Sequence, residues 1–175
     1  NNYNSAPIVG RIPALGFNND TESRVSVIYV PCYLNGTDGI FNLSYYQLLP
    51  GLDATVFASY YEPWGYTPLE SIAFGVPTVT TTLAGFGQWI LATAPNSFEG
   101  SGVRVAERTD SNYQQAVDAI TADLRTLIAM PAAEIKDVRA AASAEAVKFL
   151  WTDFIKYYLT AYNEAIASAK SRKQK

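Results

Sequence analysis

The sequence predicts an α/β fold with a parallel sheet covered by helices. Three observations support this prediction. Short runs rich in β-branched residues recur along the chain, segments with helical spacing of apolar residues lie between them, and glycine and proline stand at the boundaries. The length of 175 residues fits one domain, and a hydrophobic content of 49% with 17% charged residues provides a sizeable core.

Four runs predict strands. Each is short and consists mainly of apolar or β-branched residues, as expected for strands of a buried parallel sheet. In chain order they are residues 26–30, 55–58, 77–81 and 103–105.

The other segments of the first half favour helices or loops. Residues 1–24 predict one short helix that ends near Gly16. Residues 35–39 read Asn-Gly-Thr-Asp-Gly and predict a loop, and residues 44–49 predict a short helix. A further helix is expected to follow the second strand and to end near Gly75.

The C-terminal part predicts two helical segments separated at Pro131. Asp110 or Ser111 is expected to cap the first segment. Its apolar positions repeat at helical spacing, at Ala116, Ile120, Leu124 and Leu127. The second segment spans residues 133–169, and its candidate inward positions are Ile135, Val138, Ala142, Phe149 and Phe154.

The composition argues against several classes of function. The net charge is −3 and the basic residues form a run only at 170–175, which argues against a nucleic acid partner. The chain has no histidine, so a Ser-His-Asp triad, a Cys-His pair and a His-based zinc site are impossible within it. The single cysteine, Cys32, excludes an internal disulfide and is expected to be buried after a strand. No apolar run reaches membrane-spanning length, so no membrane partner is expected.

Residues 60–70 read Tyr-Tyr-Glu-Pro-Trp-Gly-Tyr-Thr-Pro-Leu-Glu and place two glutamates across a strand-to-helix turn. Glu62 is expected on the loop and Glu70 in the first turn of the helix. Thr67 is expected to cap this helix, with Pro68 at its first position. Open α/β sheets bind ligands outside the carboxyl ends of their strands, and a helix N-terminus there offers N–H groups to a phosphate or a sugar hydroxyl. The two carboxylates therefore mark a candidate binding site.

This segment resembles the donor-site motif of retaining two-domain glycosyltransferases. Its sequence is similar to that of the glycogen synthase family of animals and fungi. The resemblance covers most of residues 25–88. It includes Tyr-Val-Pro-Cys-Tyr-Leu at 29–34, Tyr45, and Thr-Thr-Thr-Leu-Ala-Gly-Phe-Gly at 80–87, which is expected to end in a tight glycine loop. The resemblance implies two Rossmann-like domains in the GT-B arrangement, with the active site in the cleft between them.

By this resemblance, residues 1–175 are a single, incomplete C-terminal nucleotide-sugar-binding domain with a long helical segment over about residues 132–170. The N-terminal domain of the same protein, and an arginine and a lysine that hold the donor diphosphate, lie upstream in the family and are expected to be missing. A diphosphate needs positive charge or many oriented N–H groups to offset its own charge. We therefore expect the chain alone to be inactive in sugar transfer.

The resemblance also implies roles for individual residues. Glu62 is the candidate catalytic residue, near the donor sugar, where a carboxylate can stabilise a developing oxocarbenium charge. Glu70 is expected to bind the ribose hydroxyls, and Tyr45 to stack on the nucleobase. The turn is expected to contact the sugar and the phosphates through backbone N–H groups and the Thr67 hydroxyl, and its residues are Trp64, Gly65, Tyr66 and Thr67. No cofactor and no metal are implied, since no Asp-x-Asp motif is present.

Each of these residues also has a purely structural interpretation. Glu62 can be a surface loop carboxylate, and Glu70 an acid placed early in a helix by the helix dipole. Thr67 can serve as the helix cap alone, and Tyr45 can simply pack against Tyr46. For Glu70 and Thr67 the two interpretations are compatible, and for Glu62 and Tyr45 the surrounding motif favours the functional one.

The function that the resemblance implies is transfer of glucose from UDP-glucose, or ADP-glucose, to an α-1,4-glucan acceptor with retention, in the cytoplasm. Two alternatives stay open. One is a retaining glycosyltransferase with a different acceptor. The other is a non-catalytic module that binds a nucleotide sugar or a glucan.

Overall fold

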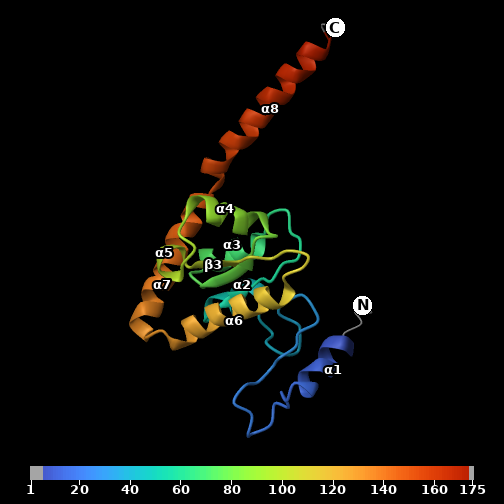
Figure 1. The fold of residues 1–175 in the computed structure, drawn as a ribbon, viewed down its shortest axis with the longest axis vertical. Helices are drawn as coiled ribbons and strands as arrows, with labels where there is room; N and C mark the ends of the chain where they lie inside the picture. Colours follow the sequence, from blue (N-terminus) through green and yellow to red (C-terminus); the bar gives the residue numbers. More distant parts are fainter. Residues whose placement is uncertain (1–5, 174–175) are drawn as a thin grey trace. The chain divides into compact units, whose positions relative to one another are not determined.

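The computed structural model of the chain describes residues 6–173. The chain divides into two compact units, Asn1–Leu48 and Leu49–Lys175, each with its own internal contacts (Figure 1).

The first unit holds two helices joined by irregular chain. Helix α1 spans Ala6–Ala14, and Gly16 follows it with a φ of 85°, which confirms the expected helix end. Helix α2 spans Tyr45–Leu48, within the predicted segment 44–49. Residues 35–39 form the expected loop.

The strand predicted at residues 26–30 is wrong, because this stretch has no neighbouring strand to pair with among the described residues. The amide side chain of Asn19 takes that place. Its Nδ2 donates to the Val27 carbonyl at 2.7 Å, and its Oδ1 accepts from the Val27 N–H at 2.7 Å. The prediction of a buried Cys32 fails for the same reason: without a sheet to cover it, the cysteine is exposed.

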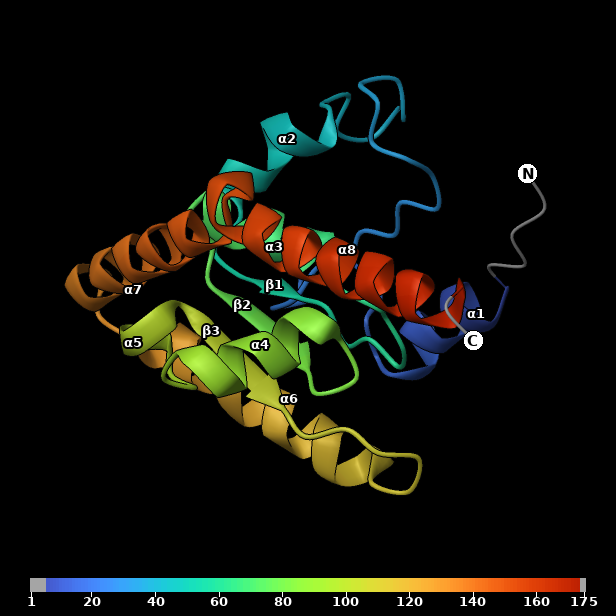
Figure 2. The same ribbon diagram turned by 90° about the horizontal axis from the view of Figure 1, so that it is seen from above.

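The second unit is built on a parallel sheet with strand order β1-β2-β3, which confirms the predicted α/β class. The strands are β1 (Thr55–Val56), β2 (Thr78–Thr81) and β3 (Val103–Ala106), and they lie side by side in Figure 2. Thr55 pairs with Thr78, and Thr78 with Val103. The predicted strand at 55–58 is shorter than expected, whereas the other two lie as predicted.

The sheet is covered by helices on both sides, with α4 and α6 on opposite sides in Figure 1. After β1 comes α3 (Tyr66–Ala73), after β2 come α4 (Gly85–Thr93) and α5 (Phe98–Ser101), and after β3 comes α6 (Tyr113–Ala129). One buried cluster joins α3, α4, β3 and α7 through Ile72, Phe86, Ile90, Val103, Val105 and Ala142. A second cluster comprises Val79, Phe98, Leu127 and Val138.

The C-terminal helical segment is broken where the sequence predicted a continuous one. Helix α7 (Ala132–Ala146) is followed by a 3-10 turn at Val147–Phe149, and α8 spans Trp151–Lys173. Leu150 is extended at the break, with a ψ of 148°. Helix α6 is capped by Asn112 rather than by Asp110 or Ser111, and Pro131 precedes α7 as expected.

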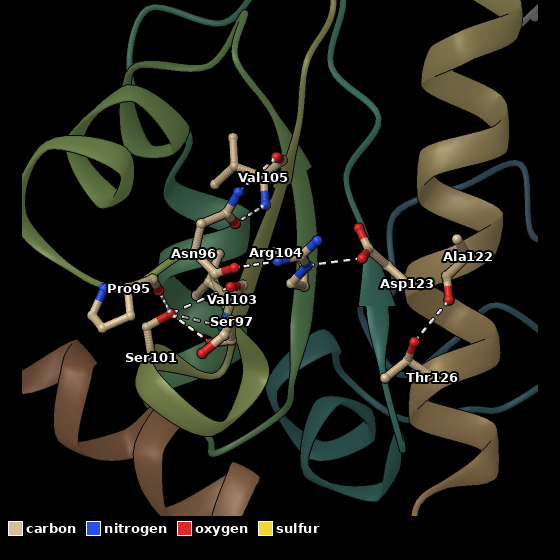
Figure 3. A network of polar contacts seen from close by, with 10 residues as sticks. All are labelled: Pro95, Asn96, Ser97, Ser101, Val103, Arg104, Val105, Ala122, Asp123 and Thr126. Atoms are coloured by element: carbon tan, nitrogen blue, oxygen red, sulfur yellow. Dashed lines mark hydrogen bonds and ion pairs between the residues drawn. The ribbon is translucent and has the colours of Figure 1, made fainter.

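A network of polar contacts closes the outer edge of the sheet at β3 (Figure 3). The side chain of Asn96 bonds both backbone groups of Val105: Nδ2 donates to the carbonyl at 3.2 Å, and Oδ1 accepts from the N–H at 2.8 Å. Arg104 donates through Nε to Asp123 on α6 at 2.8 Å, and through Nη1 to the Asn96 carbonyl. The edge strand is thereby tied to its flanking segments, which protects it from pairing with another chain.

Candidate functional site

Two loops at the carboxyl edge of the sheet are paired with each other. The loop after β1 holds Glu62, and the short loop after β2 holds Leu83 and Ala84. Glu62 forms a parallel bridge with Ala84: its N–H donates to the Leu83 carbonyl at 3.0 Å, and its carbonyl accepts from the Gly85 N–H at 3.1 Å. Both backbone groups of Glu62 are therefore satisfied, and its position is fixed as it would be in a strand.

The carboxylate of Glu62 lies beside the start of α3. Its Oε2 accepts a hydrogen bond from the Ser59 hydroxyl at 3.1 Å, and it lies 3.5 Å from the point where a Cβ on Gly65 would stand. Gly65 caps α3 in a left-handed conformation, with φ 110° and ψ 74°, which only glycine adopts readily. The half-buried carboxylate is thus held at the carboxyl edge next to a helix start that no side chain caps.

Helix α3 begins two residues earlier than predicted. Because Gly65 takes the cap position, Tyr66 is the first helical residue, and the predicted cap at Thr67 is wrong. Pro68 is buried at the third position, still in the first turn, where its missing N–H does no harm. Glu70 consequently lies in the second turn and not in the first, and it is half-buried.

The glycine run at 85–87 opens α4 and does not form the predicted loop. A side chain on Gly85 would overlap the Pro63 carbonyl, and one on Gly87 would overlap the Thr81 carbonyl. The two glycines therefore let α4 press against the Glu62 loop and against the end of β2. The N–H of Phe86 also donates to the Trp64 carbonyl at 2.6 Å, which joins the second helix start to the same loop.

The turn residues Trp64, Tyr66 and Thr67 have different surroundings. The Trp64 ring is half-buried in an aromatic cluster, whereas Tyr66 and Thr67 are exposed. The rings around Trp64 have centroids 5.7–6.3 Å away and belong to Phe86, Trp89, Phe149 and Phe154. A groove of about 220 Å³ lies beside the turn and is lined by Trp64, Tyr66, Leu69, Phe149, Trp151, Phe154 and Tyr158. The side chain of Trp64 thus packs in the core, and its backbone lies at the site.

Tyr45 belongs to the first unit, where it is the first residue of α2. It is half-buried, and its ring centroid lies 5.4 Å from that of Tyr46. This contact is the packing that its structural interpretation expects. Its stacking on a nucleobase stays a prediction.

The loop after β3 carries residues that the sequence analysis did not connect with the site. The guanidinium carbon of Arg108 lies 5.6 Å from the centroid of the Tyr60 ring and 5.1 Å from that of Tyr113. The Tyr60 hydroxyl donates to Asp110 at 2.6 Å, and this bond raises the pKa of Tyr60 above its usual value. Their place directly after the third parallel strand was the signal that could have revealed them.

Within residues 6–173, no three or more acidic, histidine or cysteine side chains gather in a way that could hold a metal ion. None of the helices described there is both long and apolar enough to cross a membrane. What the described part of the site offers to a ligand is therefore the Glu62 carboxylate, the start of α3 and exposed aromatic surface.

A parallel sheet that presents these groups at its carboxyl edge places the chain in the class of Rossmann-like α/β domains. The chain belongs to the glycogen synthase family, a family of glycosyltransferases, since the model of that family matches residues 1–173. The family resemblance first seen at residues 60–70 is thereby confirmed over nearly the whole chain.

Individual relatives agree with this assignment. The chain is 34% identical over 120 residues to the glycogen [starch] synthase of Neurospora crassa, a match that covers 69% of the chain and 17% of that protein. It is 44% identical over 84 residues to glycogen [starch] synthase isoform 1 of Saccharomyces cerevisiae, which covers 48% of the chain and 12% of the relative. The human liver glycogen [starch] synthase is 44% identical over 81 residues, covering 46% and 12%. The chain spans no more than about a sixth of these relatives.

Proposed function

We propose that the chain is the donor-binding part of a retaining glycosyltransferase that transfers glucose from UDP-glucose to an α-1,4-glucan in the cytoplasm. The single observation that carries the proposal is the Glu62 carboxylate beside the left-handed Gly65 cap of α3. The names of the relatives support the glucan acceptor. The sequence of the motif at residues 60–70 favours UDP-glucose over ADP-glucose.

The reaction separates charge at the sugar. When the bond between glucose C1 and the diphosphate breaks, positive charge develops at C1 and negative charge on the leaving diphosphate. Glu62 stabilises the positive charge, since only the Ser59 hydroxyl occupies its carboxylate among the described contacts and lone pairs remain for a ligand. The start of α3 stabilises the negative charge through its N–H groups, and the hydroxyl of Thr67 adds a donor.

The remaining residues bind the donor nucleotide. Glu70 accepts hydrogen bonds from the ribose hydroxyls, and Tyr45 stacks on the base. No cofactor or metal takes part. The diphosphate also requires the arginine and the lysine expected upstream, together with the domain that binds the acceptor, so the 175-residue chain alone is inactive.

Replacement of Glu62 in the full-length protein tests the proposal. Glu62→Gln keeps the size of the side chain and removes its charge, so kcat for glucan elongation should fall by about 100-fold or more, while the affinity for UDP stays close to that of the wild type. The matched control is Glu134→Gln, which removes an exposed carboxylate on α7. An unchanged elongation rate in the Glu62 variant would contradict the catalytic role and favour a non-catalytic binding module.

A further inference from the structure

The loop that follows β3 is attached to the loop that carries Glu62. The Tyr60 hydroxyl donates to the Asp110 carboxylate at 2.6 Å, and Arg108 lies between the rings of Tyr60 and Tyr113, 5.6 and 5.1 Å from their centroids. Tyr60 precedes Glu62 by two residues, so a restraint on its side chain restrains the backbone that presents the carboxylate.

A second set of contacts joins the same loops through Ser59, Thr81 and Thr82. The Ser59 hydroxyl donates to Glu62, and the Ser59 carbonyl accepts from the Thr81 hydroxyl at 2.6 Å. The next residue, Thr82, is bonded to Arg108 twice: its hydroxyl donates to the Arg108 carbonyl at 3.1 Å and accepts from the Arg108 N–H at 2.9 Å. The three loops at the carboxyl edge are thus connected from Glu62 to Arg108.

The Tyr60 contact contributes little to the core of the fold. Tyr60 is 58% exposed, and Asp110 is exposed as well. Contacts between exposed polar and charged groups add little to the free energy of folding. Within residues 6–173, the backbone groups of Tyr60 and Tyr61 have no backbone hydrogen-bond partner, so the side chain of Tyr60 adds a restraint to the part of the loop between Ser59 and Glu62. A contact that is weak for stability but placed next to the candidate catalytic residue has a natural role in positioning.

We propose that Tyr60 and Asp110, with Arg108 held between the two tyrosine rings, position the Glu62 loop for the transfer step. They are positioning residues, since they act through the backbone of Glu62 and do not themselves need to touch the substrate. The inference rests on the proposed function. It adds the loop after β3 to the proposed active site. This loop would determine how precisely the Glu62 carboxylate is positioned.

The test compares variants of the full-length enzyme in glucan elongation from UDP-glucose. Tyr60→Phe removes the hydroxyl and keeps the ring over Arg108, and Asp110→Ala removes the acceptor. Each should lower kcat by about tenfold, with the KM for the donor and the melting temperature unchanged, because misplacement of a reacting group slows the reaction without weakening binding. Asp110→Asn should restore part of the rate, since its amide oxygen still accepts a hydrogen bond.

The double variant Tyr60→Phe/Asp110→Ala should be no slower than either single variant, because both remove the same contact. The matched controls are Tyr162→Phe, at a residue 57% exposed on α8, and Asp118→Asn, on the exposed side of α6; both should keep the wild-type rate.

An active wild type whose Tyr60 and Asp110 variants keep the wild-type kcat would overturn this inference alone. A fall in kcat matched by a fall in melting temperature would also overturn it, in favour of a structural role. An inactive wild type would overturn the proposed function and, with it, the inference.

Discussion

Glu62 is held in place by its backbone, and its side chain is left available. Its N–H and carbonyl are bonded to the loop after β2, whereas the described contacts of its carboxylate are limited to the Ser59 hydroxyl. A residue held in this way can present an oxygen to a ligand without losing a contact that the fold requires. The same pairing places the carboxylate next to Gly65, where a side chain would intrude.

The substitution Gly65→Ala should destabilise the second unit by about 1–3 kcal/mol, since alanine is strained at a φ of 110°. Its Cβ would also stand 3.2 Å from Pro68 Cγ and 3.4 Å from Phe86 Cβ. Urea unfolding followed by tryptophan fluorescence measures the change. Gly51→Ala is the control, because Gly51 has nothing within 4 Å of an added Cβ and should give no loss. Equal midpoints for the two variants would contradict the strain at Gly65.

The Tyr60–Asp110 contact predicts a pH dependence at high pH. The bond to Asp110 raises the pKa of Tyr60 above 10.0, and the nearby Arg108 opposes this shift only in part. Because the folded-state pKa lies above that of the unfolded chain, the contribution of the contact to stability is present below pH 10 and is lost as the pH rises through the folded-state pKa.

The absorbance of tyrosinate measures this titration in the difference between the wild type and Tyr60→Phe. The difference should develop above the pH at which a free tyrosine ionises. A midpoint at or below 10.0 would contradict the contact.

At the scale of elements, the ion pair between Arg104 and Asp123 ties β3 to α6. Asp123→Ala leaves the Arg104 guanidinium without this partner in a partly buried place, and should destabilise the protein by about 1–3 kcal/mol. Thermal unfolding provides the measurement. Asp118→Ala removes an exposed carboxylate from the same helix and should have an effect near zero. If the two variants melted at the same temperature, the Arg104–Asp123 pair would contribute nothing to the fold.

The sequence predicted correctly those elements whose residue types and spacing reflect local burial and helical periodicity. The strands at β2 and β3 are apolar and β-branched because they are buried, and α6 carries the expected spacing from Ala116 to Leu127. The errors lie where a distant contact decides. Residues 26–30 have strand-forming residues, but Asn19 takes the place of a partner strand.

The loop predicted at Gly85 and Gly87 was wrong for a physical reason. Glycine weakens a helix by about 1 kcal/mol relative to alanine, so Gly85 and Gly87 favoured a loop over the start of α4. Their actual role is to allow the backbone of α4 to approach Pro63 and Thr81. That role depends on contacts between loops, which local sequence patterns do not report. The residues of the Glu62 loop were recognisable in the sequence, whereas the contacts of Arg108 and Asp110 with this loop became visible only in the fold.

At the scale of the whole molecule, the chain supplies the donor-binding part of the proposed active site. It spans 17% or less of the relatives that it matches, and the proposed donor site needs cations and an acceptor surface from upstream segments. The edge formed by the Glu62 loop, the two helix starts and the Arg108 loop is the part of the described structure that would face them.

The most direct measurement follows the products that the full-length protein forms from a short α-1,4-glucan and ¹³C-labelled UDP-glucose or ADP-glucose. We expect new α-1,4 bonds from UDP-glucose, at a higher rate than from ADP-glucose, and loss of this product in Glu62→Gln. No elongation from either donor, or a product with the β configuration, would contradict the proposed function.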